Sequence, residues 1–160
     1  MAQYHQQEKE FDETVIQIKR VSKKTKGGNT MRFTALVVVG DKKGKVGVGL
    51  AKSSDVRGAI QKAVELAKRE MFSVATSGTT TPCSVNEKFS AAKVILKPAP
   101  VGSGIIAGGP MRVVLEAAGI RDAVGKILGT TNKASNVYAT VAALKKVSLI
   151  DTRKKLRKGK

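Results

Sequence analysis

The sequence contains few of the residues that most chemical and redox functions need. It has no tryptophan, and aromatic residues make up 4% of its 160 residues, which argues against binding nucleobases by stacking on aromatic side chains. Cys83 is the only cysteine, so an internal disulfide is excluded, and with His5 as the only histidine a structural zinc site is disfavoured. We expect Cys83 to fill a small apolar gap, because nothing marks it as a nucleophile.

Long apolar runs and acidic clusters are also missing. No run approaches the roughly 18 apolar residues of a membrane span. Residues 1–10 are polar and lack the apolar core of a signal peptide, so we expect a reducing, cytoplasmic setting, with the interior of an organelle as the alternative. The acids outside the termini form no motif and fit turns, caps and helix surfaces; they include Asp41, Asp55, Glu65, Glu70, Glu116 and Asp122. The sequence therefore predicts no catalytic residue, no metal site and no cofactor.

Positive charge is what the chain has in excess. Thirty Lys and Arg against twelve Asp and Glu give a formal net charge of +18. A compact domain repels itself at such a charge, so a polyanionic partner is expected, most often nucleic acid. The charge is uneven: residues 21–32 carry four cations and no acid, and residues 151–160 carry six cations and one acid. With few aromatics, contact with phosphates and recognition of shape are favoured.

The first half of the chain predicts an antiparallel sheet with one helix. Apolar residues alternate or cluster as in strands over residues 13–21, 31–39 and 46–50, and then recur at helical spacing over residues 53–72. Ser54 or Asp55 is suited to cap that helix. Gly47 and Gly49 leave one face of the third strand almost bare, so we expect a neighbouring group to approach its backbone closely there. We predict a flexible arm over residues 1–12 and a domain over residues 13–73.

The second half predicts strands and helices of a separate α/β unit, which makes the whole chain an α+β protein. A linker over residues 74–84, rich in Ser and Thr, precedes a domain over residues 85–148 and a mobile basic tail over residues 149–160. Pro110 can begin a helix and Gly119 can end it. The expected elements are strands over residues 90–96 and within 120–128, and helices over 111–118 and 136–147, the last capped by Ser135 or Asn136.

The first candidate site is the cationic segment 22–30, which is too long for a tight hairpin loop. Its cations, hydroxyls and glycine amides can all contact phosphates, so we expect it to protrude and bind RNA. The candidate RNA-binding residues are Lys19, Arg20, Ser22, Lys23, Lys24, Thr25, Lys26, Gly27, Gly28, Asn29, Arg32, Lys45 and Lys52.

The second candidate is the glycine loop of residues 102–109, which leads into a helix. It resembles a dinucleotide-binding fingerprint, but the spacing between its second and third glycines is one residue too long, and Asp122 follows a helix instead of a strand. We therefore expect no nucleotide, but an anion site made by amides beside the helix N-terminus. The residues expected at an interface with protein or RNA are Gly102, Gly104, Gly108, Gly109 and Arg112.

Long strings in both halves resemble one known family. They are residues 19–23, 26–28, 33–41, 44–49 and 59–63 in the first half, and 96–99, 102–109, 111–120 and 136–137 in the second. In order, and from about residue 11 to residue 147, they are similar to bacterial small-subunit ribosomal protein S5. Two segments, residues 82–91 and 130–136, depart from the family's pattern.

The resemblance implies a first domain similar to a double-stranded-RNA-binding fold and a second domain with a left-handed crossover. It implies binding to small-subunit ribosomal RNA beside proteins S4 and S8, near the messenger-RNA entrance, with an influence on decoding fidelity. The basic segment 21–28 would lie near the RNA site of spectinomycin, and Gly104 and Arg112 would face S4.

Two other functions are compatible with parts of the sequence. A free-standing double-stranded-RNA binder or RNA chaperone would use the first domain, but it gives no reason for the glycine loop. A nucleotide-using enzyme is disfavoured by the glycine spacing.

Overall fold

The computed structural model describes residues 11–158, so most of the expected N-terminal arm, with His5, and the last two residues lie outside the described part. The first unit is the predicted antiparallel sheet with one helix. Its elements are β1 (Asp12–Thr25), β2 (Gly28–Gly40), β3 (Lys45–Ser53), α1 (Val56–Arg69) and β4 (Phe72–Ser73), and the strands are ordered β1-β2-β3-β4. Asp55 caps α1 as predicted, since its Oδ2 accepts a hydrogen bond of 2.9 Å from the Gly58 amide.

The bare face of β3 is closely approached, as the sequence predicts, and the element that approaches it is α1. A Cβ at Gly47 would lie 2.1 Å from the Ala67 carbonyl oxygen, and one at Gly49 would lie 1.9 Å from that of Ala63. The helix backbone therefore rests directly on the strand, and the small side chain of buried Ala59 also faces this interface. Only glycine in β3 permits such a close approach.

The second unit is a mixed sheet covered by two helices. Its elements are β5 (Val85–Phe89), β6 (Ala92–Pro98), β7 (Ile105–Ile106), α2 (Gly109–Ala117), β8 (Ala123–Leu128) and α3 (Lys133–Lys158). The order is β5-β6-β8-β7, and β7 and β8 run parallel with α2 between them in the chain. Strand β5 was not predicted, and the next strand was predicted to begin at residue 90, but Ser90 has a positive φ of 55° and lies in the turn between β5 and β6.

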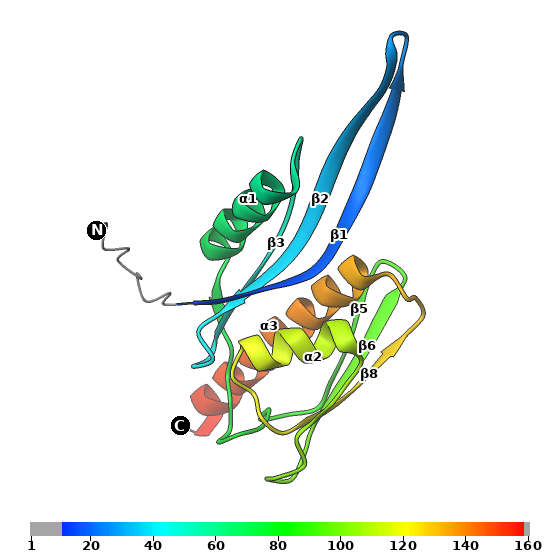
Figure 1. Ribbon diagram of the computed structural model, residues 1–160. Coiled ribbons are helices and arrows are strands. Elements are labelled where there is room, and N and C mark those ends of the chain that lie inside the picture. The colour runs from blue at the N-terminus through cyan, green and yellow to red at the C-terminus, as the bar shows by residue number, and fades with distance from the viewer. Residues whose placement is uncertain (1–10, 159–160) are drawn as a thin grey trace, which may run out of the picture.

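The layers follow one another as α1, the first sheet, the pair α2 and α3, and the second sheet (Figure 1). Alternate residues of β2 face opposite ways. Ala35, Val37 and Val39 pack against α1, whereas Leu36 and Val38 join the core formed with α2, α3 and the second sheet. The first sheet is thus buried on both faces over half of β2, which explains its near-continuous apolar run.

The predictions for α2 hold, while those for α3 need correction. Pro110 lies in the first turn of α2, and Gly119 follows its end with a φ of 81°. Helix α3 begins earlier than predicted, because the Asn132 side chain accepts a 3.2 Å hydrogen bond from the Ala134 amide. It also continues to Lys158, where we expected a mobile tail, because its Leu, Lys and Arg residues are good helix formers even without apolar periodicity. No helix of the described part is long and apolar enough to span a membrane.

Candidate nucleic-acid interface

The cationic segment is not a loop but the end of a continuous β-hairpin. Strands β1 and β2 remain paired up to Thr25 and Gly28, which leaves a turn of two residues, Lys26 and Gly27. Gly28 has a φ of 132°, and the Thr25 hydroxyl donates a 2.8 Å hydrogen bond to the Gly28 carbonyl. The prediction of a long loop was wrong because backbone pairing needs no apolar side chains once the register and a glycine turn are set. The hairpin projects far beyond the rest of the molecule (Figure 1).

Strand register divides the hairpin cations between two faces. Cross-strand pairs Lys19 with Thr34, Val21 with Arg32 and Lys23 with Thr30 share one face, and Lys52 of β3 joins it opposite Thr34. The cationic face is defined here as Lys19, Lys23, Arg32 and Lys52. Arg20, Lys24 and Asn29 point to the opposite face, on the side of α1. Both surfaces of the hairpin therefore present positive charge to a partner.

A groove runs along the cationic face from the base of the hairpin toward its end. Its volume is about 440 Å³, and its lining consists of Val21, Ser22, Lys23, Thr25, Thr30, Arg32 and Lys52. All residues from 21 to 32 are exposed, and within the described residues none of the cations at positions 19–32 takes part in an ion pair. The combination of hydroxyls with unpaired cations is what phosphate oxygens require.

One predicted RNA-binding residue lies away from this group. Lys45 begins β3 at the end of the sheet opposite the hairpin, where it pairs with Ser73 and donates its amide to Asp41. The other twelve candidates lie on the hairpin or, for Lys52, beside its base.

The glycine loop is held by the buried carboxylate of Asp122, a residue that the sequence suggested only as a possible nucleotide ligand. The amides of Gly102 and Gly104 donate hydrogen bonds of 3.0 and 2.9 Å to Oδ1 of Asp122, which is 4% exposed. The nearby Thr79 hydroxyl and these amides lower the pKa of Asp122. Two of the amides expected to bind an external anion are thus occupied from within, which corrects that prediction. Asp122 directly precedes the apolar strand β8, and an acid in that position was the signal that could have predicted its hydrogen bonds to the glycine loop.

Of the remaining interface candidates, Gly108, Gly109 and Arg112, only Arg112 lines an open groove. Gly108 precedes α2 as its N-cap, Gly109 begins the helix, and Arg112 is exposed in its first turn. The groove has a volume of about 610 Å³ and is lined by Lys42, Ile105, Arg112, Glu116, Gly119, Ile120 and Arg121. Arg112 makes no ion pair within residues 11–158, so its guanidinium is available to a neighbouring molecule.

A basic α+β protein with a protruding cationic hairpin belongs to the class of RNA-binding proteins that contact phosphates. Comparison with family models identifies the family. Residues 11–75 match the N-terminal domain of ribosomal protein S5, and residues 87–157 match the C-terminal domain of ribosomal protein S5. The chain therefore belongs to the ribosomal protein S5 family. It is a structural protein of the small ribosomal subunit and binds ribosomal RNA, and its family is not one of enzymes.

Proposed function

We propose that this chain contacts small-subunit ribosomal RNA chiefly through the β1–β2 hairpin. The observation that carries the proposal is the hairpin itself, with exposed cations on both faces and no acid between residues 17 and 34. A hairpin that buries few of its own side chains contributes little to the core, so its length and charge are best explained by a partner that surrounds it. The cationic face with its groove then contacts one phosphate backbone, while Arg20 and Lys24 reach another.

We further propose that the chain acts in cytoplasmic ribosomes near the messenger-RNA entrance and influences decoding accuracy. The groove beside Arg112 would contact protein S4, and protein S8 would be a second neighbour. Family resemblance supports these roles, and the exposed position of Arg112 in the first turn of α2 is compatible with a contact to a carboxylate of a neighbouring protein.

The RNA contact is tested by combining Lys23→Ala, Lys24→Ala and Lys26→Ala. Binding to a full-length small-subunit ribosomal RNA transcript is measured over a series of salt concentrations. When the logarithm of the binding constant is plotted against the logarithm of the salt concentration, each neutralised phosphate contributes roughly −0.7 to −0.9 to the slope. We therefore expect the slope for the triple variant to be shallower by about 2 to 3. The free energy of unfolding should change by less than about 1 kcal/mol, because all three side chains are exposed.

The matched control removes the same formal charge from residues that already have a partner. Lys42, Lys68 and Lys146 form ion pairs with Asp12, Glu13 and Glu87, so their joint replacement by Ala should leave the slope nearly unchanged. Equal losses in both variants would show that binding depends on net charge alone and would contradict the hairpin assignment. Sedimentation of the wild-type chain at moderate salt adds a second check, since a free-standing RNA binder would not migrate with small subunits.

A further inference from the structure

Helix α3 extends beyond the core that it helps to build. Val147 is fully buried and Ile150 packs partly against the core, but no side chain of residues 151–157 belongs to it. Leu149 and Leu156 are 60% and 70% exposed. The last turns of the helix are therefore not explained by packing within this chain.

These last turns carry positive charge that the helix does not neutralise. Asp151 is the only acid in α3, and its carboxylate pairs with Lys155 at 2.7 Å. Arg153, Lys154 and Arg157 are exposed and make no ion pair with any described residue. A helix dipole favours cations, but only within the final turn, so it does not account for Arg153 and Lys154.

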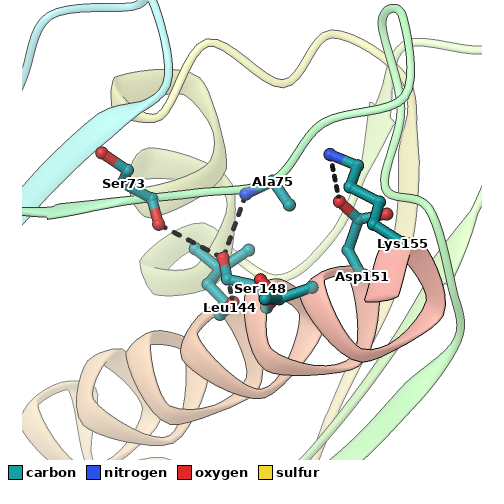
Figure 2. A network of polar contacts seen from close by, with 7 residues as sticks. Ser73, Ala75, Leu144, Ser148, Asp151 and Lys155 are labelled. Carbon is teal, nitrogen blue, oxygen red and sulfur yellow. Dashed lines mark hydrogen bonds and ion pairs between the residues drawn. The ribbon is translucent and has the colours of Figure 1, made fainter. Parts of the chain in front are cut away.

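The direction of this extension is fixed by a polar anchor just before it. The Ser148 hydroxyl accepts a 3.0 Å hydrogen bond from the Ala75 amide and lies 3.2 Å from the carbonyl oxygens of Ser73 and Leu144 (Figure 2). These contacts join α3 to β4 and to the segment that connects the two units. The cations that follow are consequently held in a defined position on the molecule.

The extension lies far from the hairpin. Helix α3 begins beside the hairpin base, where Asn132 and Ala134 line a small cavity of about 190 Å³ with Gln17 and Lys19. At 1.5 Å per residue, its 26 residues span about 39 Å. The hairpin end and the C-terminal end of α3 accordingly lie at opposite ends of the molecule (Figure 1).

We propose that Arg153, Lys154 and Arg157 form a second surface that contacts ribosomal RNA phosphates, so that the chain joins two separate stretches of RNA. The proposal rests on the proposed function, since it takes RNA as the partner. Two arginines favour this occupant, because guanidinium groups bind phosphate oxygens bidentately. The hairpin and the end of α3 lie too far apart for a single turn of an RNA helix to reach both. Once RNA is bound at one of these surfaces, the effective concentration of RNA at the other surface is raised.

The test uses the full chain with Arg153→Gln, Lys154→Gln and Arg157→Gln combined. Glutamine has a helix propensity close to that of Lys and Arg, so α3 should persist, which circular dichroism verifies. Binding to full-length small-subunit ribosomal RNA is again measured over a series of salt concentrations. We expect the slope of the logarithm of the binding constant against the logarithm of the salt concentration to become shallower by about 2 to 3, as for three lost phosphate contacts. Replacing only Arg153 and Arg157 by Lys retains the charges and should restore most of the slope.

Hydroxyl-radical footprinting of the same RNA separates the two surfaces. The hairpin variant should lose protection at one set of nucleotides and the α3 variant at another. If the α3 variant keeps the wild-type slope and footprint while the hairpin variant loses both, the second surface is refuted and the proposed function stands. If its RNA binding is unchanged but incorporation into small subunits falls, the partner is a protein, and the proposal is also overturned. A hairpin variant with wild-type binding would contradict the proposed function itself.

Discussion

Substituting Gly49 by alanine tests the claim that α1 rests directly on the backbone of β3. The added Cβ would lie 1.9 Å from the Ala63 carbonyl oxygen and 2.9 Å from its carbonyl carbon. Both are backbone atoms of a helix, so no side-chain rotation can relieve the contact. The helix must move away from the sheet by about 1.5 Å to reach an ordinary contact of 3.4 Å.

Such a movement has a cost that can be bounded. A gap of about 0.5 to 1 Å already removes a quarter to a half of the dispersion attraction across an interface. Ala59, Ala63 and Ala67 are fully buried against the sheet and would all lose contact. Overpacking of a core typically costs about 1 to 3 kcal/mol, and a Gly to Ala change returns about 0.4 to 1 kcal/mol through the unfolded chain. We expect a net loss of about 1 to 2 kcal/mol in the free energy of unfolding.

Urea unfolding followed by circular dichroism measures this loss, with Gly27→Ala as the matched control. Gly27 lies at the hairpin turn, a Cβ there would meet nothing within 4 Å, and its φ is outside the left-handed range. The control should remain within about 0.5 kcal/mol of the wild type. A Gly49→Ala protein as stable as the control would show that α1 does not pack on β3 as described.

Two further predictions concern the second unit. Hydrogen bonds hold the pKa of the Asp122 carboxyl group below its ordinary value of 3.8. The ionised carboxylate therefore stabilises the fold fully above pH 3.8, and this stabilisation is lost as the pH falls through the lower pKa of the folded state. Acid unfolding of Asp122→Asn should therefore vary less with pH below about 4 than that of the wild type, and identical profiles would contradict these hydrogen bonds. For Arg112→Leu, we expect a change in stability within about 0.5 kcal/mol but a higher error frequency in a misreading reporter. Unchanged errors with normal incorporation into ribosomes would mean that Arg112 is only a solvated cation.

Local signals predicted the first unit well, because each depends on neighbours in the chain. Asp55 caps α1 by bonding to an amide three residues away, and the apolar spacing of the helix needs no distant partner. Gly47 and Gly49 predicted a close approach, although only the fold identifies α1 as the element that approaches. The charge excess and its placement were sufficient to predict a polyanionic partner, most often nucleic acid.

The ends of strands and helices were predicted poorly where a strand or helix continues through polar residues. The hairpin between residues 22 and 30 and the end of α3 both lack the apolar periodicity on which the predictions depend. In the hairpin, pairing with the opposite strand maintains the structure, and in α3 the Ser148 anchor and good helix formers do so. The opposite strand and the partners of Ser148 lie outside the local window of sequence, whereas the helix propensity of the end of α3 was a local signal that the prediction did not use.

The sequence by itself determined the class of protein, the two α+β units and the charge that calls for a polyanion, because these follow from composition and local spacing. Tertiary structure alone decided which cations share a face, since a shift of one residue in strand register would exchange Lys23 with Lys24. It also decided that Asp122 closes on the glycine loop 18 and 20 residues away, and that α3 carries its cations to the end of the molecule opposite the hairpin. These arrangements depend on long-range pairing and packing, which the order of residues specifies only through the completed fold.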